Sequence, residues 1–227
     1  MNRAVWLPEM LRFARAGYVV ASIEYRTSNE ANFPAQLIDV KSAVRFLRAH
    51  AKEFCVDPGR IYAMGESAGG TMASLLGVTG DQKEFDQGDH LDQSSAVQGV
   101  VDYYGVVDLS DASAEKDRKL AAANQSNDVP YFAFEEFLGV GYGKAEADKA
   151  SAIQYVSEET PPFMILHGTE DAVVPMAQSE KLYNTLQKAG IPCEIAVVEG
   201  AAHGDDLFYQ DEMIDLVLSF LDRLSGN

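Results

Sequence analysis

Short apolar runs alternate with longer segments of helical period along most of the chain, and this alternation restricts its fold more than any other feature. The apolar runs are rich in β-branched and aromatic residues, and they occupy 17–25, 61–64, 97–104, 163–166 and 194–198. Strands that are buried on both faces read as nearly continuous apolar runs of this kind. We therefore expect these runs to lie inside one sheet.

The segments between these runs carry apolar residues three and four positions apart, the spacing of one helix face. They occupy 34–51, 68–77, 179–189 and 212–224. Alternation of strand and helix predicts an α/β fold, a mostly parallel sheet with helices on both faces. At 227 residues the chain is long enough for one sizeable core, so we expect a single domain over 1–227.

The segment from about 109 to 156 interrupts the alternation. A charged, alanine-rich part is followed by an aromatic part that contains Tyr131, Phe132 and Phe134. An insertion this long inside a compact domain is usually functional or disordered. We expect a cap over the strand ends, with a surface excursion as the alternative. The three aromatic side chains are candidates for lining a substrate pocket, although they could equally form a small core of the cap.

The stretch GESAGG, residues 65–70, stands between an apolar run and a helical segment. A bare G-x-S-x-G is common by chance, but the strand–turn–helix setting is the one that a nucleophile elbow requires. Ser67 is the candidate nucleophile, the backbone N–H of Ala68 a candidate oxyanion donor, and Glu66 a candidate substrate contact. The alternative is a turn that needs small residues, with Gly69 and Gly70 allowing close packing.

A serine hydroxyl is a poor nucleophile and needs a base within hydrogen-bonding reach and an acid that orients this base. Asp171 follows the apolar run 163–166, and His203 follows the run 194–198. Both lie in loops at the carboxyl ends of predicted strands, where open α/β sheets bind ligands. The order Ser, Asp, His along the chain is the one expected for an α/β-hydrolase.

Other residues remain open for these two roles. Glu170 and Asp108 are carboxylates in suitable loops and compete for the role of the acid. His167 ends a predicted strand, and we expect its imidazole to hold its own turn. His50 ends an amphipathic helix and His90 lies in an acidic loop, so both are expected at the surface.

Composition restricts the partners. The formal net charge of −17 repels phosphate backbones and anionic membranes, so we expect neither nucleic-acid nor membrane binding. The apolar runs are shorter than the roughly 20 residues of a membrane helix. The two cysteines lack metal-binding spacing. No cofactor and no metal are expected, and a homo-oligomer is left open. The partner that we expect for the candidate triad is a small-molecule ester, and the acidic composition permits a neutral one.

The chain resembles the α/β-hydrolase serine esterases, in particular the bacterial group of feruloyl and acetyl-xylan esterase-like enzymes, which is related to the hormone-sensitive-lipase group. The resemblance is carried by GYVVASIEYR, DPGRIYAMGESAGG, SAIQYVSEETPPFMILHGTEDAVVP and VVEGAAHG. It implies ester hydrolysis through an acyl-enzyme, with Ser67 as nucleophile, His203 as general base and Asp171 as orienting acid. It also points to acetyl or feruloyl esters of carbohydrates.

The chain departs from this family at its front. Such esterases usually carry an HGG-type stretch whose N–H groups complete the oxyanion hole, after a strand that lies between the counterparts of 17–25 and 61–64. The sequence begins too late to contain either. We expect an upstream segment to be missing; the alternatives are direct pairing of the two flanking strands or a strand lent by a neighbouring subunit. As written the chain carries no targeting signal and would be cytoplasmic, but a signal peptide would lie in the missing part.

Two other functions stay open. A serine peptidase of the prolyl-oligopeptidase type shares the fold and the order of the triad, but such enzymes typically have Tyr after the nucleophile where this chain has Ala68. A non-catalytic binding protein on a truncated hydrolase fold would be expected to lose a member of the triad, and all three candidates are present.

Overall fold

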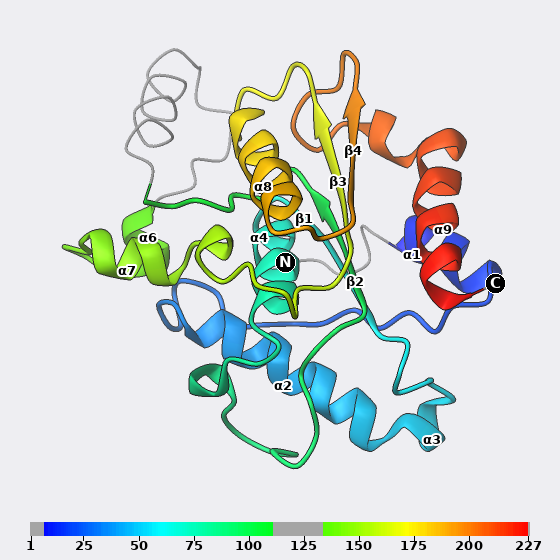
Figure 1. Cartoon of the computed structure of the whole chain (residues 1–227), viewed down its shortest axis with the longest axis horizontal. Helices are drawn as coiled ribbons and strands as arrows, with labels where there is room; N and C mark the ends of the chain where they lie inside the picture. The colour runs from blue at the N-terminus through cyan, green and yellow to red at the C-terminus, as the bar shows by residue number, and fades with distance from the viewer. Residues whose placement is uncertain (1–6, 111–133, 227) are drawn as a thin grey trace.

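In the computed structural model, which describes residues 7–110 and 134–226, four parallel strands form the centre of the molecule (Figure 1). They are β1 (Tyr62–Glu66), β2 (Gly99–Tyr103), β3 (Phe163–Gly168) and β4 (Cys193–Val198). Their order across the sheet follows their order in the chain. Each connection therefore returns over the sheet to start the next strand at the same end, and all carboxyl ends meet at one edge.

The strand predicted over 17–25 is wrong for the described structure, where this segment runs without strand pairing between α1 and α2 (Figure 1). Its side chains still reach the core: Tyr18 and Val20 pack against one apolar cluster, and Ile23 and Tyr25 against the other. Direct pairing of this segment with β1 is contradicted as well. A local apolar pattern selects an extended, half-buried backbone, but a strand also needs a neighbour for its hydrogen bonds.

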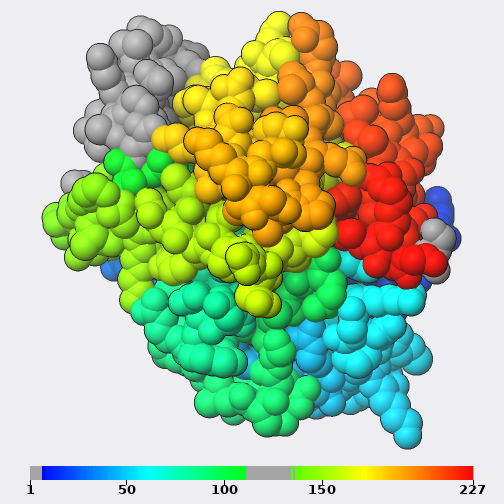
Figure 2. All heavy atoms as spheres, viewed as in Figure 1, coloured from blue at the N-terminus to red at the C-terminus, as the bar shows by residue number. Residues whose placement is uncertain are grey.

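Helices cover both faces of the sheet. The helices of the described residues are α1 (Leu7–Arg15), α2 (Ala35–Ala49), α3 (Ala51–Phe54), α4 (Ala68–Val78), α6 (Phe134–Leu138), α7 (Lys144–Lys149), α8 (Ala177–Lys188) and α9 (Asp211–Ser225). Figure 1 shows α2, α4 and α8 on one side of the sheet and α1 and α9 on the other. In the space-filling view, α8 and the chain leading into β4 cover the strands on the near face (Figure 2).

The core consists of two apolar layers, one on each side of the sheet. Along β2 and β3, successive side chains point to opposite faces: Val100 and Ile165 enter the layer under α2, α4 and α8, while Val101 and Met164 enter the layer under α9. Every residue of β2 and β3 is buried. The prediction of strands buried on both faces is confirmed for these two.

A cluster of buried charges fixes the loop between α4 and β2. The side chains of Lys41 and Arg45 on α2 are fully buried and lie 3.3 and 3.2 Å from Oδ1 of Asp86. Lys41 also donates to the carbonyl of Gln82, at 3.0 Å. Burial lowers the pKa of Lys41, and the charge of Asp86 opposes this effect.

Only the second half of the predicted insertion is described, with α6, α7 and the short turn Ala152–Gln154. Phe134 is 3% exposed and belongs to the core layer of α2 and α4, and Phe137 packs 5.5 Å from the ring of Phe33. Tyr131 and Phe132 lie outside the described residues. The cap and its substrate-lining aromatics therefore stay predictions. Within the described ranges, no helix has the length and apolarity needed to span a membrane.

Candidate active site

Ser67 occupies the sharp turn between β1 and α4, with φ 52° and ψ −117°. Such a backbone is strained for any residue with a side chain. The flanking glycines are required by space, because a Cβ on Gly65 would lie 2.3 Å from the carbonyl oxygen of Gly69. A Cβ on Gly70 would lie 2.5 Å from a carboxylate oxygen of Asp102. The small residues thus leave room for the strained turn that carries Ser67, which is half-buried.

Ser67, His203 and Asp171 lie in one hydrogen-bonded chain. Nε2 of His203 is 2.9 Å from Oγ of Ser67, and Nδ1 of His203 is 2.7 Å from Oδ2 of Asp171. A carboxylate can only accept, so Nδ1 carries the proton and Nε2 is free to accept from the serine hydroxyl. Asp171 follows β3 and His203 follows β4, so the shared carboxyl edge of the sheet brings the three loops together.

Asp171 is held firmly in this position. Its side chain is 1% exposed, and its other oxygen, Oδ1, accepts from the backbone N–H groups of Val173 and Val174, each at 2.8 Å. These two bonds satisfy the buried charge and fix the orientation of the carboxylate. The imidazole of His203, with 16% of its side chain exposed, remains within reach of solvent at the open edge.

The competing carboxylates lie elsewhere. Glu170 is exposed, and its backbone N–H donates to the carbonyl of Ala201. Asp108 accepts from Nζ of Lys181 at 2.7 Å and from the hydroxyl of Ser110 at 2.8 Å. No described interaction links either carboxylate to His203.

His167 has the structural role that the sequence predicts. Its Nε2–H donates to the carbonyl of Val174 at 2.9 Å, and its Nδ1 accepts from the hydroxyl of Ser179 at 2.7 Å. Burial lowers its pKa, so the ring is neutral and braces the loop that carries Asp171. His50 and His90 are half-buried and lie beside each other, with ring centroids 5.2 Å apart.

Two tyrosines at the site were missed by sequence reasoning. Tyr104 directly follows β2, has φ 43°, and places its ring centroid 4.7 Å from that of His203. Its hydroxyl donates to Oε2 of Glu66 at 2.6 Å, and the hydroxyl of Tyr209 donates to the same oxygen at 2.5 Å. The candidate substrate contact Glu66 is thus engaged by protein groups. Tyr104 could have been found from its place at the end of the apolar run 97–104.

Burial raises the pKa of both tyrosine hydroxyls above the ordinary value, and the carboxylate of Glu66 raises it further. The two side chains therefore stay protonated and act as donors throughout the neutral range. The sequence offered no signal for Tyr209, because it reaches Glu66 across 143 positions of the chain.

A third buried group, Asp102 on β2, lies beneath the first turns of α4. Its Oδ2 accepts from the hydroxyl of Ser74 at 2.6 Å and its Oδ1 accepts from the N–H of Gly105 at 2.8 Å. Burial raises the pKa of Asp102 to about 6, against the smaller lowering effect of these two bonds. Nothing in the sequence separated this aspartate from the others.

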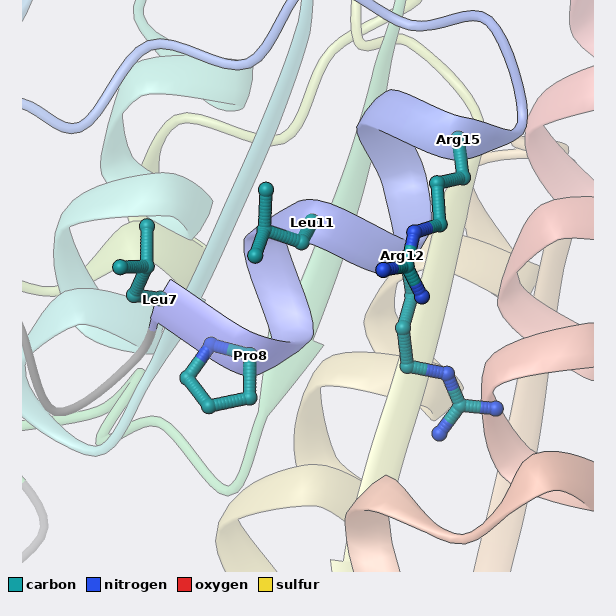
Figure 3. A pocket seen from close by; sticks show the side chains of 5 residues that line it. All are labelled: Leu7, Pro8, Leu11, Arg12 and Arg15. Carbon is teal, nitrogen blue, oxygen red and sulfur yellow. The ribbon is translucent and has the colours of Figure 1, made fainter.

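A surface hollow of about 480 Å³ lies along α1, away from the triad, and is lined by Leu7, Pro8, Leu11, Arg12 and Arg15 (Figure 3). Figure 3 shows the apolar side chains at the start of the helix and the arginines toward its end. Among the described residues, no group of three or more His, Cys, Asp or Glu side chains is arranged to hold a metal ion.

Comparison with known sequences matches residues 4–186 to the BD-FAE family model. Esterase LipQ of Mycobacterium tuberculosis is 32% identical over 201 residues, which are 88% of this chain and 46% of the relative. A probable isoprenylcysteine alpha-carbonyl methylesterase, ICMEL1 of Arabidopsis thaliana, is 29% identical over 86% of this chain and 40% of its own length. The chain therefore spans about half the length of these curated relatives.

Solved structures of esterases share the fold. A truncated carbohydrate esterase from gut microbiota superposes with a TM-score of 0.77 at 30% identity, covering 94% of this chain and 76% of its own. The acetyl ester-xyloside bifunctional hydrolase of Caldicellulosiruptor lactoaceticus gives a TM-score of 0.79 at 26% identity. The superposition covers 96% of this chain and 76% of the hydrolase. With its parallel sheet and two helical layers, the chain has the α/β-hydrolase fold, and the predicted fold class is confirmed.

Proposed function

The chain belongs to the BD-FAE family, and from this membership and the geometry at Ser67 we propose that it hydrolyses carboxylic esters. Ser67 is the nucleophile, His203 the general base and Asp171 the acid that orients it. The observation that carries the proposal is the continuous chain from Asp171 through His203 to Ser67, with bonds of 2.7 and 2.9 Å at the carboxyl edge of the sheet.

The reaction proceeds in two halves. Oγ of Ser67 attacks the ester carbonyl while Nε2 of His203 takes its proton, and the same proton then passes to the departing alcohol. Water activated by His203 releases the acid from the acyl-enzyme and regenerates Ser67. Asp171 stabilises the imidazolium that forms in both halves and stays ionised throughout.

The developing oxyanion needs hydrogen-bond donors, and we assign one of them to the N–H of Ala68. Ala68 is the first residue of α4, so its N–H has no acceptor inside the helix and lies at the positive end of the helix dipole. One such donor is worth roughly 10²–10³ in turnover, or about 3–4 kcal/mol.

We assign neutral carbohydrate esters with small acyl groups as the substrate class. Two solved relatives are described as a carbohydrate esterase and an acetyl ester-xyloside hydrolase, and the net charge of −17 disfavours anionic esters. Acetylated xylan fragments fit this class, and feruloylated ones are the bulkier alternative. Comparing release of acetate and of ferulate from matched xylo-oligosaccharides distinguishes the two.

The first experiment measures release of p-nitrophenol from p-nitrophenyl acetate by the wild-type chain and by Ser67→Ala, with folding checked by circular dichroism. We expect release that is lost in the variant. Labelling by a fluorophosphonate probe should occur at Ser67 and be absent in Ser67→Ala. A folded wild-type chain that neither releases p-nitrophenol nor takes the label would contradict the proposal and favour a binding protein.

A further inference from the structure

The carboxylate of Glu66 lies at the centre of a hydrogen-bonded cluster that the proposed reaction does not use directly. Its Oε2 accepts from the hydroxyls of Tyr104 and Tyr209, at 2.6 and 2.5 Å, and these two hydroxyl oxygens are 3.4 Å apart. Both donors come from other loops: Tyr104 follows β2, and Tyr209 ends the short turn Asp206–Tyr209 that follows His203.

Each tyrosine connects Glu66 to His203 by a different route. The ring of Tyr104 packs against the imidazole, with centroids 4.7 Å apart. Tyr209 lies six positions after His203, so its bond to Glu66 holds the far end of the histidine loop. Glu66 itself is covalently joined to Ser67. The Glu66 carboxylate therefore links Ser67 to the tyrosine ring that packs against His203 and to the loop that carries His203.

The cluster is rigidly supported. The N–H of Tyr104 donates to the carbonyl of Leu166 at 2.8 Å. The ring of Tyr209 stacks on that of Tyr103, with centroids 6.1 Å apart. The backbone carbonyl of Tyr209 accepts from Nη1 of Arg12 at 2.7 Å. Arg12 projects from α1, as Figure 3 shows. Contacts from β2, β3 and α1 therefore hold the two tyrosines in place.

We propose that Glu66, Tyr104 and Tyr209 form a positioning cluster that keeps Nε2 of His203 at hydrogen-bonding distance from Oγ of Ser67. The inference rests on the proposed esterase function and adds three residues to it. It gives Glu66 a positioning role in place of the substrate contact expected from the sequence, because its Oε2 accepts from two tyrosine hydroxyls. Since small displacements of reacting groups cost large factors in rate, removing one hydroxyl should lower turnover and leave substrate binding unchanged.

The test compares Tyr209→Phe and Glu66→Gln with Tyr18→Phe. Tyr18 is a matched control, because its hydroxyl also donates to a carboxylate, that of Asp222 on α9, at 2.6 Å and outside the site. We expect kcat on p-nitrophenyl acetate to fall about tenfold or more in Tyr209→Phe, with KM within twofold and Tm lowered no more than in Tyr18→Phe. Glu66→Gln keeps one acceptor oxygen, so its kcat should fall less than that of Tyr209→Phe. The kcat of the double variant should be no lower than that of Tyr209→Phe alone.

A second readout needs no turnover. The downfield proton NMR signal of the His203–Asp171 hydrogen bond should shift or broaden in Tyr209→Phe and in Glu66→Gln, and should be unchanged in Tyr18→Phe. Wild-type kcat together with an unchanged signal in Tyr209→Phe would overturn the cluster. A large rise in KM at constant kcat in Glu66→Gln would overturn it too, by making Glu66 a substrate contact. Failure of the esterase proposal looks different, because the folded wild-type chain would then neither release p-nitrophenol nor take the fluorophosphonate label, or Ser67→Ala would be as active as the wild type.

Discussion

Two residues with side chains adopt positive φ at the candidate site, Ser67 and Tyr104. Such conformations cost about 1–3 kcal/mol each and persist where the surroundings hold them. The N–H of Ser67 donates to the carbonyl of Tyr103 at 2.9 Å, and that of Tyr104 to Leu166 at 2.8 Å. Backbone strain is thus placed at the ends of neighbouring strands, where it aims both side chains at His203.

At this scale the identity of the acid can be tested. Asp171→Asn should lower kcat by about 10⁴ with little change in KM, because the amide favours the wrong tautomer of His203. The matched control is Glu170→Gln, which alters the neighbouring, exposed carboxylate and should retain wild-type kcat. Steady-state kinetics on p-nitrophenyl acetate check both. Loss of activity in Glu170→Gln instead would transfer the role of the acid to Glu170.

Asp102 makes stability depend on pH. Its folded pKa of about 6 lies above the value near 3.8 of the unfolded chain, so its contribution to stability is present below pH 3.8 and is lost as the pH rises through 6. The difference corresponds to about 3 kcal/mol at neutral pH. The side chain of Asp102→Asn does not titrate. The Tm of this variant minus that of the wild type should therefore increase as the pH rises from 4 to 8. Thermal melts of both proteins across this range test it, and parallel curves would contradict it.

Among the elements, α2 acts through charge as well as apolar packing. Its apolar face, with Leu37, Val40 and Val44, lies in the core, and its buried Lys41 and Arg45 reach Asp86 in the loop before β2. A buried pair of this kind contributes little net stability, but breaking it leaves an uncompensated charge in the interior.

Asp86→Asn should therefore lower the free energy of unfolding by about 3–5 kcal/mol, because Lys41 and Arg45 lose their buried counter-charge. The control is Asp148→Asn, which breaks the exposed pair with Lys144, 2.6 Å long, and should cost under about 1 kcal/mol. Urea titrations of the two variants measure the difference. Equal losses would show that the buried cluster is not energetically special.

Over the whole molecule, the net charge of −17 is spread on a chain with 35 acidic and 18 basic residues. Like charges repel in the folded state, and salt screens this repulsion beyond a Debye length of about 10 Å at 0.1 M.

Raising NaCl from about 10 mM to 300 mM at pH 7.5 should therefore raise Tm by a few degrees. The effect should shrink in acid, as carboxylates become protonated and the repulsion disappears. Calorimetry at both pH values tests the prediction. A Tm that falls with salt at pH 7.5 would mean that ion pairs outweigh the overall repulsion.

The sequence by itself determined the α/β alternation, the burial of β2 and β3 on both faces, and the three residues that the structure brings together at the carboxyl edge. These features are local: an apolar period selects a strand or helix, and the glycines of GESAGG allow a sharp turn between β1 and α4 where a side chain would clash. The catalytic role of Ser67, His203 and Asp171 stays a prediction, although their distances now support it.

Only the tertiary structure decided which groups meet across the chain. It left 17–25 without strand pairing, because an apolar pattern does not specify a partner strand. It also joined Glu66 to Tyr104 and Tyr209, and placed Asp102 under α4. Such contacts depend on the relative position of distant elements, and burial and hydrogen bonding arise only once these elements have packed.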